Sequence, residues 1–169
     1  MSAPAPRRAR PRLDEPAPAP PPADATANAL PFLLDFMPRE AETETRLAEF
    51  FRRLRAGRLA TTRCPRDGEL AWPPRTVCPR CHLGELEWVD LPETGRIYAF
   101  SAVLGGAPLG MEAEVPFAVG LVDLDGVPLR LFGRIVGRPW GELAIGDRVR
   151  VESYDVEDGR VFYRFRAPG

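Results

Sequence analysis

The sequence predicts a mainly β protein that consists of an N-terminal helix, a zinc ribbon and a five-stranded OB-fold barrel. Two observations lead to this fold class. All three cysteines of the 169-residue chain lie between residues 64 and 81, at the spacing of two metal-binding knuckles. Beyond residue 92, short runs of β-branched and aromatic residues alternate with glycine-containing turns, which is typical of a small barrel.

The composition divides the chain into four parts. Residues 1–29 are rich in proline, alanine and arginine and contain almost no large apolar residues, so we expect a disordered tail. A docking segment and helix follow in residues 30–57, the zinc ribbon in 58–91 and the OB-fold domain in 92–169. Residues 30–37 contain six large apolar residues in eight. This segment either docks onto another molecule or packs against its own helix.

A helical pattern covers residues 40–56. Leucine and phenylalanine recur in it at steps of three and four residues, and Gly57 is a suitable terminator. Acidic residues precede arginines along this stretch, which is the order that the helix dipole favours. We interpret the apolar stripe as ordinary packing rather than a cofactor-binding face. A short strand is expected from residue 58 to residue 63, leading into the ribbon.

The most informative motif is a pair of knuckles, Cys64-x-x-Asp67 and Cys78-x-x-Cys81, which are separated by ten residues. Each knuckle is a tight turn whose side chains converge on one point, as tetrahedral zinc requires. Asp67 stands where a four-cysteine ribbon has its fourth cysteine, and carboxylate is a harder and less usual ligand in structural sites. Two interpretations stay open: a ribbon that has begun to lose its metal, or one zinc held by Cys64, Asp67, Cys78 and Cys81.

Other uses of the cysteines fit the sequence less well. An odd number of cysteines in one cluster, in a chain without a signal peptide, does not suit a disulfide framework. His82 is the chain's single histidine and directly follows Cys81. It is either a substitute ligand or an exposed neighbour, and it is a poor general base for a cysteine nucleophile.

Five strands are predicted after the ribbon. A sandwich would need about seven strands, so five closely spaced and mostly antiparallel strands favour an OB-fold. Asp125-Gly126 between two of the runs is a strong hairpin signal, and Pro128 makes that end of the following run an edge or a strand start. The five runs are residues 96–104, 115–124, 127–136, 148–154 and 160–166.

The composition also argues against several classes of protein. The formal net charge is -1, so the chain lacks the basic footprint of a duplex-DNA binder. No apolar run reaches the roughly 18 residues that a membrane-spanning helix needs. The first residues lack the apolar centre of a signal peptide, and we expect a cytoplasmic protein.

Several stretches resemble one family of two-module proteins, the rubredoxin-like zinc-ribbon plus OB-fold proteins associated with acyl-CoA metabolism. The resemblance covers residues 40–168, and its most specific part is the second knuckle with its Trp72-Pro73-Pro74 lead. Asp67 departs from the family pattern, which has cysteine at this position. The stretches that carry the resemblance are residues 50–59, 72–81, 86–89, 95–101, 145–149 and 165–168.

This resemblance implies a non-catalytic accessory subunit. Members of the family act beside thiolase-superfamily enzymes, where the small protein completes or supports the acyl-CoA site of its partner. The resemblance therefore implies a hetero-oligomer with a thiolase-like protein, one zinc in the ribbon and a CoA thioester bound through the complex. The loop of residues 105–114, with Leu109 and Met111, is our choice for the contact with the partner.

The residues themselves favour an accessory or binding role by exclusion. The sequence shows no Ser/His/Asp set and no glycine-rich phosphate loop between a strand and a helix. A single-stranded nucleic-acid-binding OB-fold is the main alternative, with Arg130, Phe132 and Arg134 on one alternating face as its best residues. A freestanding enzyme would need a zinc held by three cysteines with an open fourth position, and a general base for it is lacking.

Overall fold

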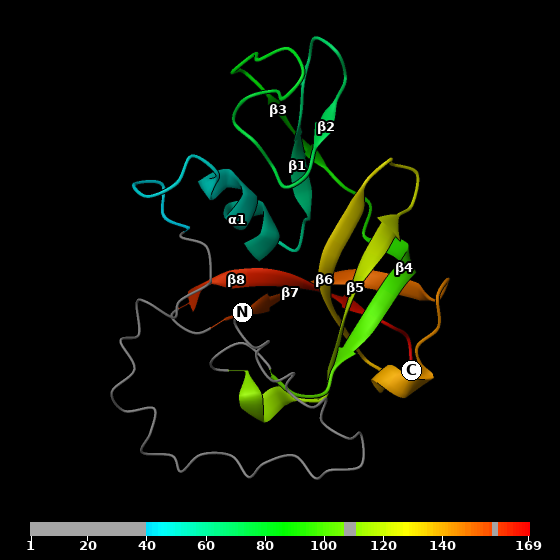
Figure 1. Cartoon of the computed structure of the whole chain (residues 1–169). Helices are drawn as coiled ribbons and strands as arrows, with labels where there is room; N and C mark the ends of the chain where they lie inside the picture. The colour runs from blue at the N-terminus through cyan, green and yellow to red at the C-terminus, as the bar shows by residue number, and fades with distance from the viewer. Residues whose placement is uncertain (1–39, 107–110, 157–158) are drawn as a thin grey trace, which may run out of the picture. The chain divides into compact units, whose positions relative to one another are not determined.

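The computed structural model describes the whole chain except residues 1–39, 107–110 and 157–158. The predicted tail, the docking segment and Leu109 of the predicted contact loop lie outside the described residues. No helix in the described part is long and apolar enough to cross a membrane. The α-helix and strands, shown in Figure 1, are α1 (Ala48–Arg55), β1 (Ala60–Arg63), β2 (Leu70–Ala71), β3 (Glu87–Asp90), β4 (Thr94–Val103), β5 (Phe117–Leu124), β6 (Arg130–Val136), β7 (Arg148–Asp155) and β8 (Val161–Arg166).

The helix begins later than the sequence pattern predicts. α1 starts at Ala48, and turns occupy most of the stretch before it. Glu40, the predicted first helical residue, is buried, and its carboxylate has two partners. One oxygen accepts a hydrogen bond from the backbone N–H of Val161 at 2.8 Å, and the other pairs with Arg55. Because these contacts tie Glu40 to the start of β8, the chain bends here instead of continuing the helix towards the N-terminus.

The ribbon is a three-stranded antiparallel sheet of order β2-β1-β3. Two buried threonines of the central strand hold the neighbouring segments. The hydroxyl of Thr61 donates to the carbonyl of Ala71, while the hydroxyl of Thr62 accepts from the N–H of Arg75 and donates to its carbonyl, both at 3.0 Å. Hydrogen bonds therefore fix the course of the chain between the knuckles, in a sheet too small to bury much apolar surface.

The barrel has five strands in the order β4-β5-β6-β8-β7, and β7 pairs with β4 to close it. Neighbouring strands are antiparallel except β6 and β8, which are parallel. Alternate residues of β5 and β6 point into the barrel, where Val122 and Leu131 are fully buried. The predicted five-stranded OB-fold is confirmed.

The connection between β5 and β6 is longer than the sequence predicts. The hairpin exists, and Gly126 has a φ of 72° in its turn, but β6 begins at Arg130, three residues later than expected. The N–H of Leu124 donates to the carbonyl of Leu129 at 3.2 Å and closes the loop. Pro128 lies inside it, and since proline has no N–H for the ladder, regular pairing starts beyond it.

One hydrophobic core joins α1 to the barrel. Leu54 of α1 and Phe165 of β8 are among its most deeply buried members. An edge-to-face series of aromatic rings extends this core to the ribbon: the ring centre of Trp72 lies 6.1 Å from that of Phe50 and 5.7 Å from that of Tyr163. Trp72 belongs to the segment between the two knuckles, so this series attaches the ribbon to both other parts.

Candidate metal centre

The first knuckle is a tight turn that runs from Cys64 to Glu69. The backbone N–H of Cys64 donates to the carbonyl of Glu69, and the N–H of Gly68 donates to the carbonyl of Cys64, both at 2.9 Å. Gly68 has a φ of 74°, in the left-handed region that glycine adopts without steric cost. These bonds close the turn and place the side chain of Asp67 beside the thiol of Cys64.

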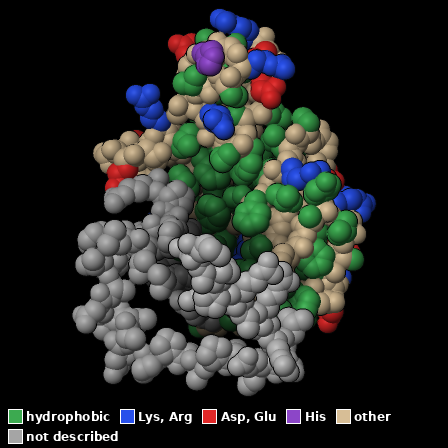
Figure 2. All heavy atoms as spheres, in the orientation of Figure 1, with side chains coloured by type: hydrophobic (Ala, Val, Ile, Leu, Met, Phe, Trp, Pro, Cys, Tyr) green, Lys and Arg blue, Asp and Glu red, His purple; other side chains and the backbone are tan. Residues whose placement is uncertain are grey.

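The second knuckle repeats this backbone. The N–H of Cys78 donates to the carbonyl of Leu83 at 2.9 Å, and the N–H of His82 donates to the carbonyl of Cys78 at 3.0 Å. His82 occupies the position of Gly68 and has a φ of 58°. Its ring is exposed, as the purple side chain in Figure 2 shows, and it is not among the grouped ligand atoms. Of the two roles that the sequence left open for His82, the structure supports the exposed neighbour.

The four residues at the ligand positions of the motif come together. One ligand atom from each of Cys64, Asp67, Cys78 and Cys81 lies within 4.8 Å of all the others. The sulfurs of Cys64 and Cys81 are 3.5 Å apart, and the sulfur of Cys78 is 3.5 Å from Oδ2 of Asp67. A tetrahedral zinc, with sulfur at about 2.3 Å and oxygen at about 2.1 Å, would set its donors about 3.6–3.8 Å apart. Two of the donor separations are close to these values, and the set of three sulfurs and one carboxylate oxygen suits a tetrahedral metal ion.

The carboxylate of Asp67 is oriented towards the thiols. Its Oδ1 accepts the backbone N–H of Glu69 at 3.0 Å, which leaves Oδ2 on the side of the three sulfurs. The N–H of Glu69, followed by the thiol of Cys64, lowers the pKa of the Asp67 carboxyl. A carboxylate that is ionised and held by a backbone donor is prepared to act as a metal ligand.

The thiols differ in the ease with which they lose their protons. Burial raises the pKa of the Cys64 thiol to about 11. The backbone N–H groups of Cys81 and Arg80 lower the pKa of Cys78; they lie 3.5 and 3.4 Å from its sulfur. A buried thiol such as Cys64 becomes a thiolate readily only beside a cation, so metal binding at this cluster would release protons.

On the barrel face considered for nucleic-acid binding, the arginines are paired with carboxylates of the same chain. Arg130 pairs with Asp123 at 2.7 Å, and its guanidinium lies over the ring of Tyr98 at 3.2 Å from the ring centre. Arg134 pairs with Glu114. Both arginines of the predicted face are thus neutralised within the chain, which leaves little attraction for a phosphate backbone.

One feature beside the ribbon, a hollow in the surface, is not indicated by any sequence pattern. A hollow of about 310 Å³ lies beside the second knuckle, and its lining residues are spread between Arg46 and Trp88. Sequence patterns did not point to it because its walls come from four separate stretches, each with an ordinary composition. Contacts between residues far apart in the sequence bring these stretches together.

Comparison with known proteins identifies the family. A model of the C-terminal OB-fold domain of ChsH2 matches residues 88–153, which include most of the barrel strands. A solved structure of an Ltp2–ChsH2(DUF35) aldolase is 26% identical, with a TM-score of 0.64, over 73% of this chain and 95% of that one. The benzoylsuccinyl-CoA thiolase subunit BbsA of Thauera aromatica is 34% identical over 117 residues, 66% of this chain and 78% of BbsA. This chain belongs to the DUF35 family.

Another DUF35 protein extends the comparison to an archaeon. The DUF35 domain-containing scaffold protein of Methanocaldococcus jannaschii is 29% identical over 113 residues, 64% of this chain and 79% of that protein. The family resemblance found in the sequence is confirmed. The relatives are described as a thiolase subunit, a scaffold protein and a component of an aldolase assembly.

Proposed function

We propose that this DUF35 protein is a non-catalytic accessory subunit of a thiolase-type enzyme that acts on acyl-CoA in the cytoplasm. The similarity to the benzoylsuccinyl-CoA thiolase subunit BbsA carries the proposal. The partner would supply the catalytic groups, and this chain would complete or support its acyl-CoA site. Positioning of a reactant can raise a rate by orders of magnitude without chemistry from the group that holds it.

The distribution of reactive side chains supports a role without catalysis of its own. All three cysteines of the sequence belong to the candidate metal centre, and the single histidine is exposed beside it. A cysteine nucleophile needs a base within hydrogen-bond reach and a lowered pKa. The pKa of Cys64 is raised instead; the pKa of Cys78 is lowered by backbone N–H groups, but its sulfur is buried within the cluster and not open to a substrate.

We propose zinc as the metal of the ribbon. Three cysteine sulfurs and one carboxylate oxygen suit zinc better than a hard cation such as magnesium, because thiolates are soft ligands. Four protein ligands would leave no open coordination position, so the ion would serve as a structural cross-link between the knuckles. Asp67 would take the fourth position through Oδ2 while Oδ1 stays on the N–H of Glu69.

Co-purification with the neighbouring gene product tests the accessory role. We expect the full chain to retain a thiolase- or aldolase-type protein and to raise its activity towards an acyl-CoA. The chain alone should turn over no acyl-CoA. Full activity of the partner without this chain would refute the accessory role. Turnover of acyl-CoA by this chain alone would show that it is itself an enzyme.

Two truncations test the docking segment predicted from the sequence. Deletion of residues 1–29 should leave complex formation nearly unchanged, because that stretch has almost no large apolar residues. Deletion of residues 1–38 also removes the apolar segment 30–37 and should weaken binding. Equal affinity of the two truncated chains would contradict a docking role for residues 30–37.

A further inference from the structure

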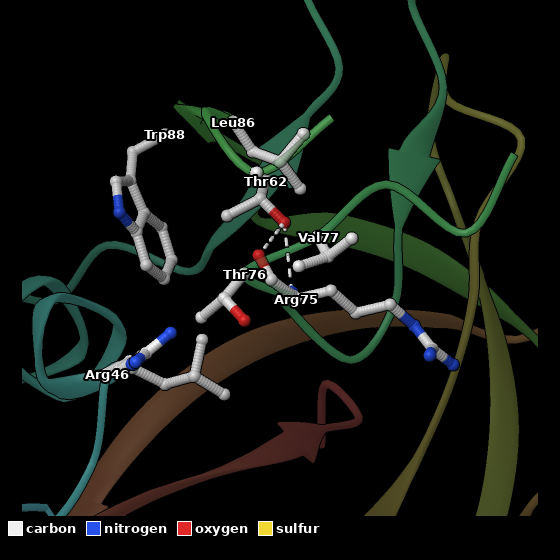
Figure 3. A pocket seen from close by; sticks show the side chains of 9 residues that line it. Arg46, Thr62, Arg75, Thr76, Val77, Leu86 and Trp88 are labelled. Carbon is white, nitrogen blue, oxygen red and sulfur yellow. Dashed lines mark hydrogen bonds between the residues drawn. The ribbon is translucent and has the colours of Figure 1, made fainter. Parts of the chain in front are cut away.

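The hollow beside the second knuckle has a mixed lining of apolar and polar side chains, with an arginine at its edge. Figure 3 shows the indole of Trp88 on one side and Leu86, Val77 and Thr62 on the other, with Arg46 at the edge below the indole. Val77, in the bend that precedes the second knuckle, is 45% exposed and so adds accessible apolar surface to the hollow. The volume of about 310 Å³ is sufficient for one large side chain and part of the segment that carries it.

The indole at this hollow is held in place by neighbouring groups. Arg53 of α1 lies with its guanidinium carbon 5.9 Å from the ring centre of Trp88, and pairs at the same time with Glu49 and with Asp90 at 2.8 Å. Restrained in this way, the aromatic surface loses little conformational entropy when another group packs against it. Such preorganised aromatic surfaces are frequent at the centres of protein interfaces.

The charge at the edge of the hollow is not balanced. Arg53, Arg58 and Arg63, from the elements around it, each pair with a carboxylate of the chain. The guanidinium of Arg46, at the edge of the hollow, has neither an ion pair nor a hydrogen bond among the described residues, whereas Arg75 lines the hollow but its side chain points away from it (Figure 3). Since most arginines of the described part are paired, the unpaired guanidinium of Arg46 offers a positive charge at the edge of the hollow that an acidic group would complement.

The walls of the hollow adjoin the candidate metal centre in the sequence. Val77 immediately precedes Cys78, and Gly84 lies three residues after Cys81, so the second knuckle separates two of the walls. Thr62, two residues before Cys64, forms another part of the lining. A metal ion that joins the knuckles would therefore hold these walls at a constant separation.

We propose that this hollow is a docking site for the partner subunit, and that it receives a large apolar side chain next to an aspartate or glutamate. This inference rests on the proposed accessory function and assigns it a surface. The apolar side chain would pack on Trp88 and Leu86, and the carboxylate would pair with Arg46. Docking would require the metal, because the metal holds the walls.

Filling the hollow tests the apolar part of the proposal. A Cβ atom on Gly84 would meet no heavy atom within 4 Å, so Gly84→Leu can occupy the space without disturbing the ribbon. We expect at least about 30-fold weaker binding to the co-purifying thiolase- or aldolase-type protein, the size of a typical hot-spot effect. Gly141→Leu, on an equally open site of the barrel, is the matched control and should change affinity by no more than about twofold.

Reversal of the charge at the edge tests the acidic part. Arg46→Glu should weaken binding about 10-fold, mainly through slower association, and should reduce its dependence on salt. Arg150→Glu is the control on the barrel, because Arg150 is exposed and its pair with Glu93 is a surface pair of small energy. Zinc content and the circular dichroism of each variant show that the fold is kept.

The outcomes separate this inference from the function on which it rests. If the wild-type chain binds a thiolase- or aldolase-type protein and Gly84→Leu and Arg46→Glu bind it equally well, the docking site lies elsewhere and the accessory function stands. If the wild-type chain binds no such protein, both are overturned. Loss of binding by both variants, with both controls unaffected and the fold intact, supports the hollow as the docking site.

Discussion

The two knuckles of the ribbon share a backbone and differ in three side chains, two of which lie at the second ligand position and at the left-handed position. In each, the N–H of the first residue bonds to the carbonyl five positions later, and the N–H of the fifth residue bonds to the first carbonyl. Asp67 in the first knuckle corresponds to Cys81 in the second, and Gly68 corresponds to His82. The first knuckle has glycine at the left-handed position but only one cysteine. The second knuckle has two cysteines but holds the backbone of a histidine in the left-handed region. Turn geometry and ligand chemistry are therefore separable in this ribbon.

Replacement of the cysteine at the first position of a knuckle, which both knuckles have, should have the largest effect on metal binding. Cys78→Ser removes a buried sulfur that accepts the N–H groups of Arg80 and Cys81, and we expect metal affinity to fall by more than about 100-fold. The barrel has its own core and should stay folded. Elemental analysis and circular dichroism of the purified variant check both expectations. A variant that still carries one zinc per chain would show that the cluster is not the binding site.

Chelation of the metal should affect amide hydrogen exchange in the ribbon and in the barrel differently. We expect amide hydrogen exchange to accelerate in β1, β2 and β3, while the strands of the barrel keep their protection, because only the ribbon depends on the cross-link. Exchange measured by mass spectrometry, before and after removal of zinc, provides the comparison. Uniform acceleration through both parts would mean that they unfold as one cooperative unit.

Asp67→Cys gives the two knuckles the same pair of candidate ligands. This change should tighten zinc binding about 10-fold, because thiolate is the softer ligand, and Asp67→Ala should weaken it by a similar factor. Competition with a chromophoric chelator measures both. Wild-type affinity for Asp67→Ala would rule out the carboxylate as a ligand and favour a site of three thiolates.

The smallest effect is expected at the left-handed position. A non-glycine residue there costs about 1–2 kcal/mol, and glycine loses about 0.5–1 kcal/mol of conformational entropy on folding. His82→Gly should therefore stabilise the second knuckle by up to about 1.5 kcal/mol. Gly68→Ala should destabilise the first knuckle by a similar amount. Opening free energies from hydrogen exchange measure both changes. Effects of the same sign would contradict this account.

Much of the site was predictable from near neighbours in the sequence. The spacing of Cys64, Asp67, Cys78 and Cys81 indicated the convergence that the structure shows, because a knuckle is closed by hydrogen bonds within six residues. The balance of charge on the barrel face was not predictable. The pairing of Arg134 with Glu114 connects residues twenty positions apart, and no local pattern indicates it.

By itself, the sequence determined the order of helix, ribbon and barrel, the five strands and the four positions of the motif whose side chains come together. These features follow from periodicity and turn residues, which act over a few positions. Only the tertiary structure decided the start of α1 and the hollow beside the second knuckle. Both depend on contacts between residues that are distant in the sequence. The carboxylate of Glu40 accepts a hydrogen bond from the N–H of Val161, and the hollow exists because folding brings Arg46 beside Trp88. Long-range packing and hydrogen bonding override local propensity at such places.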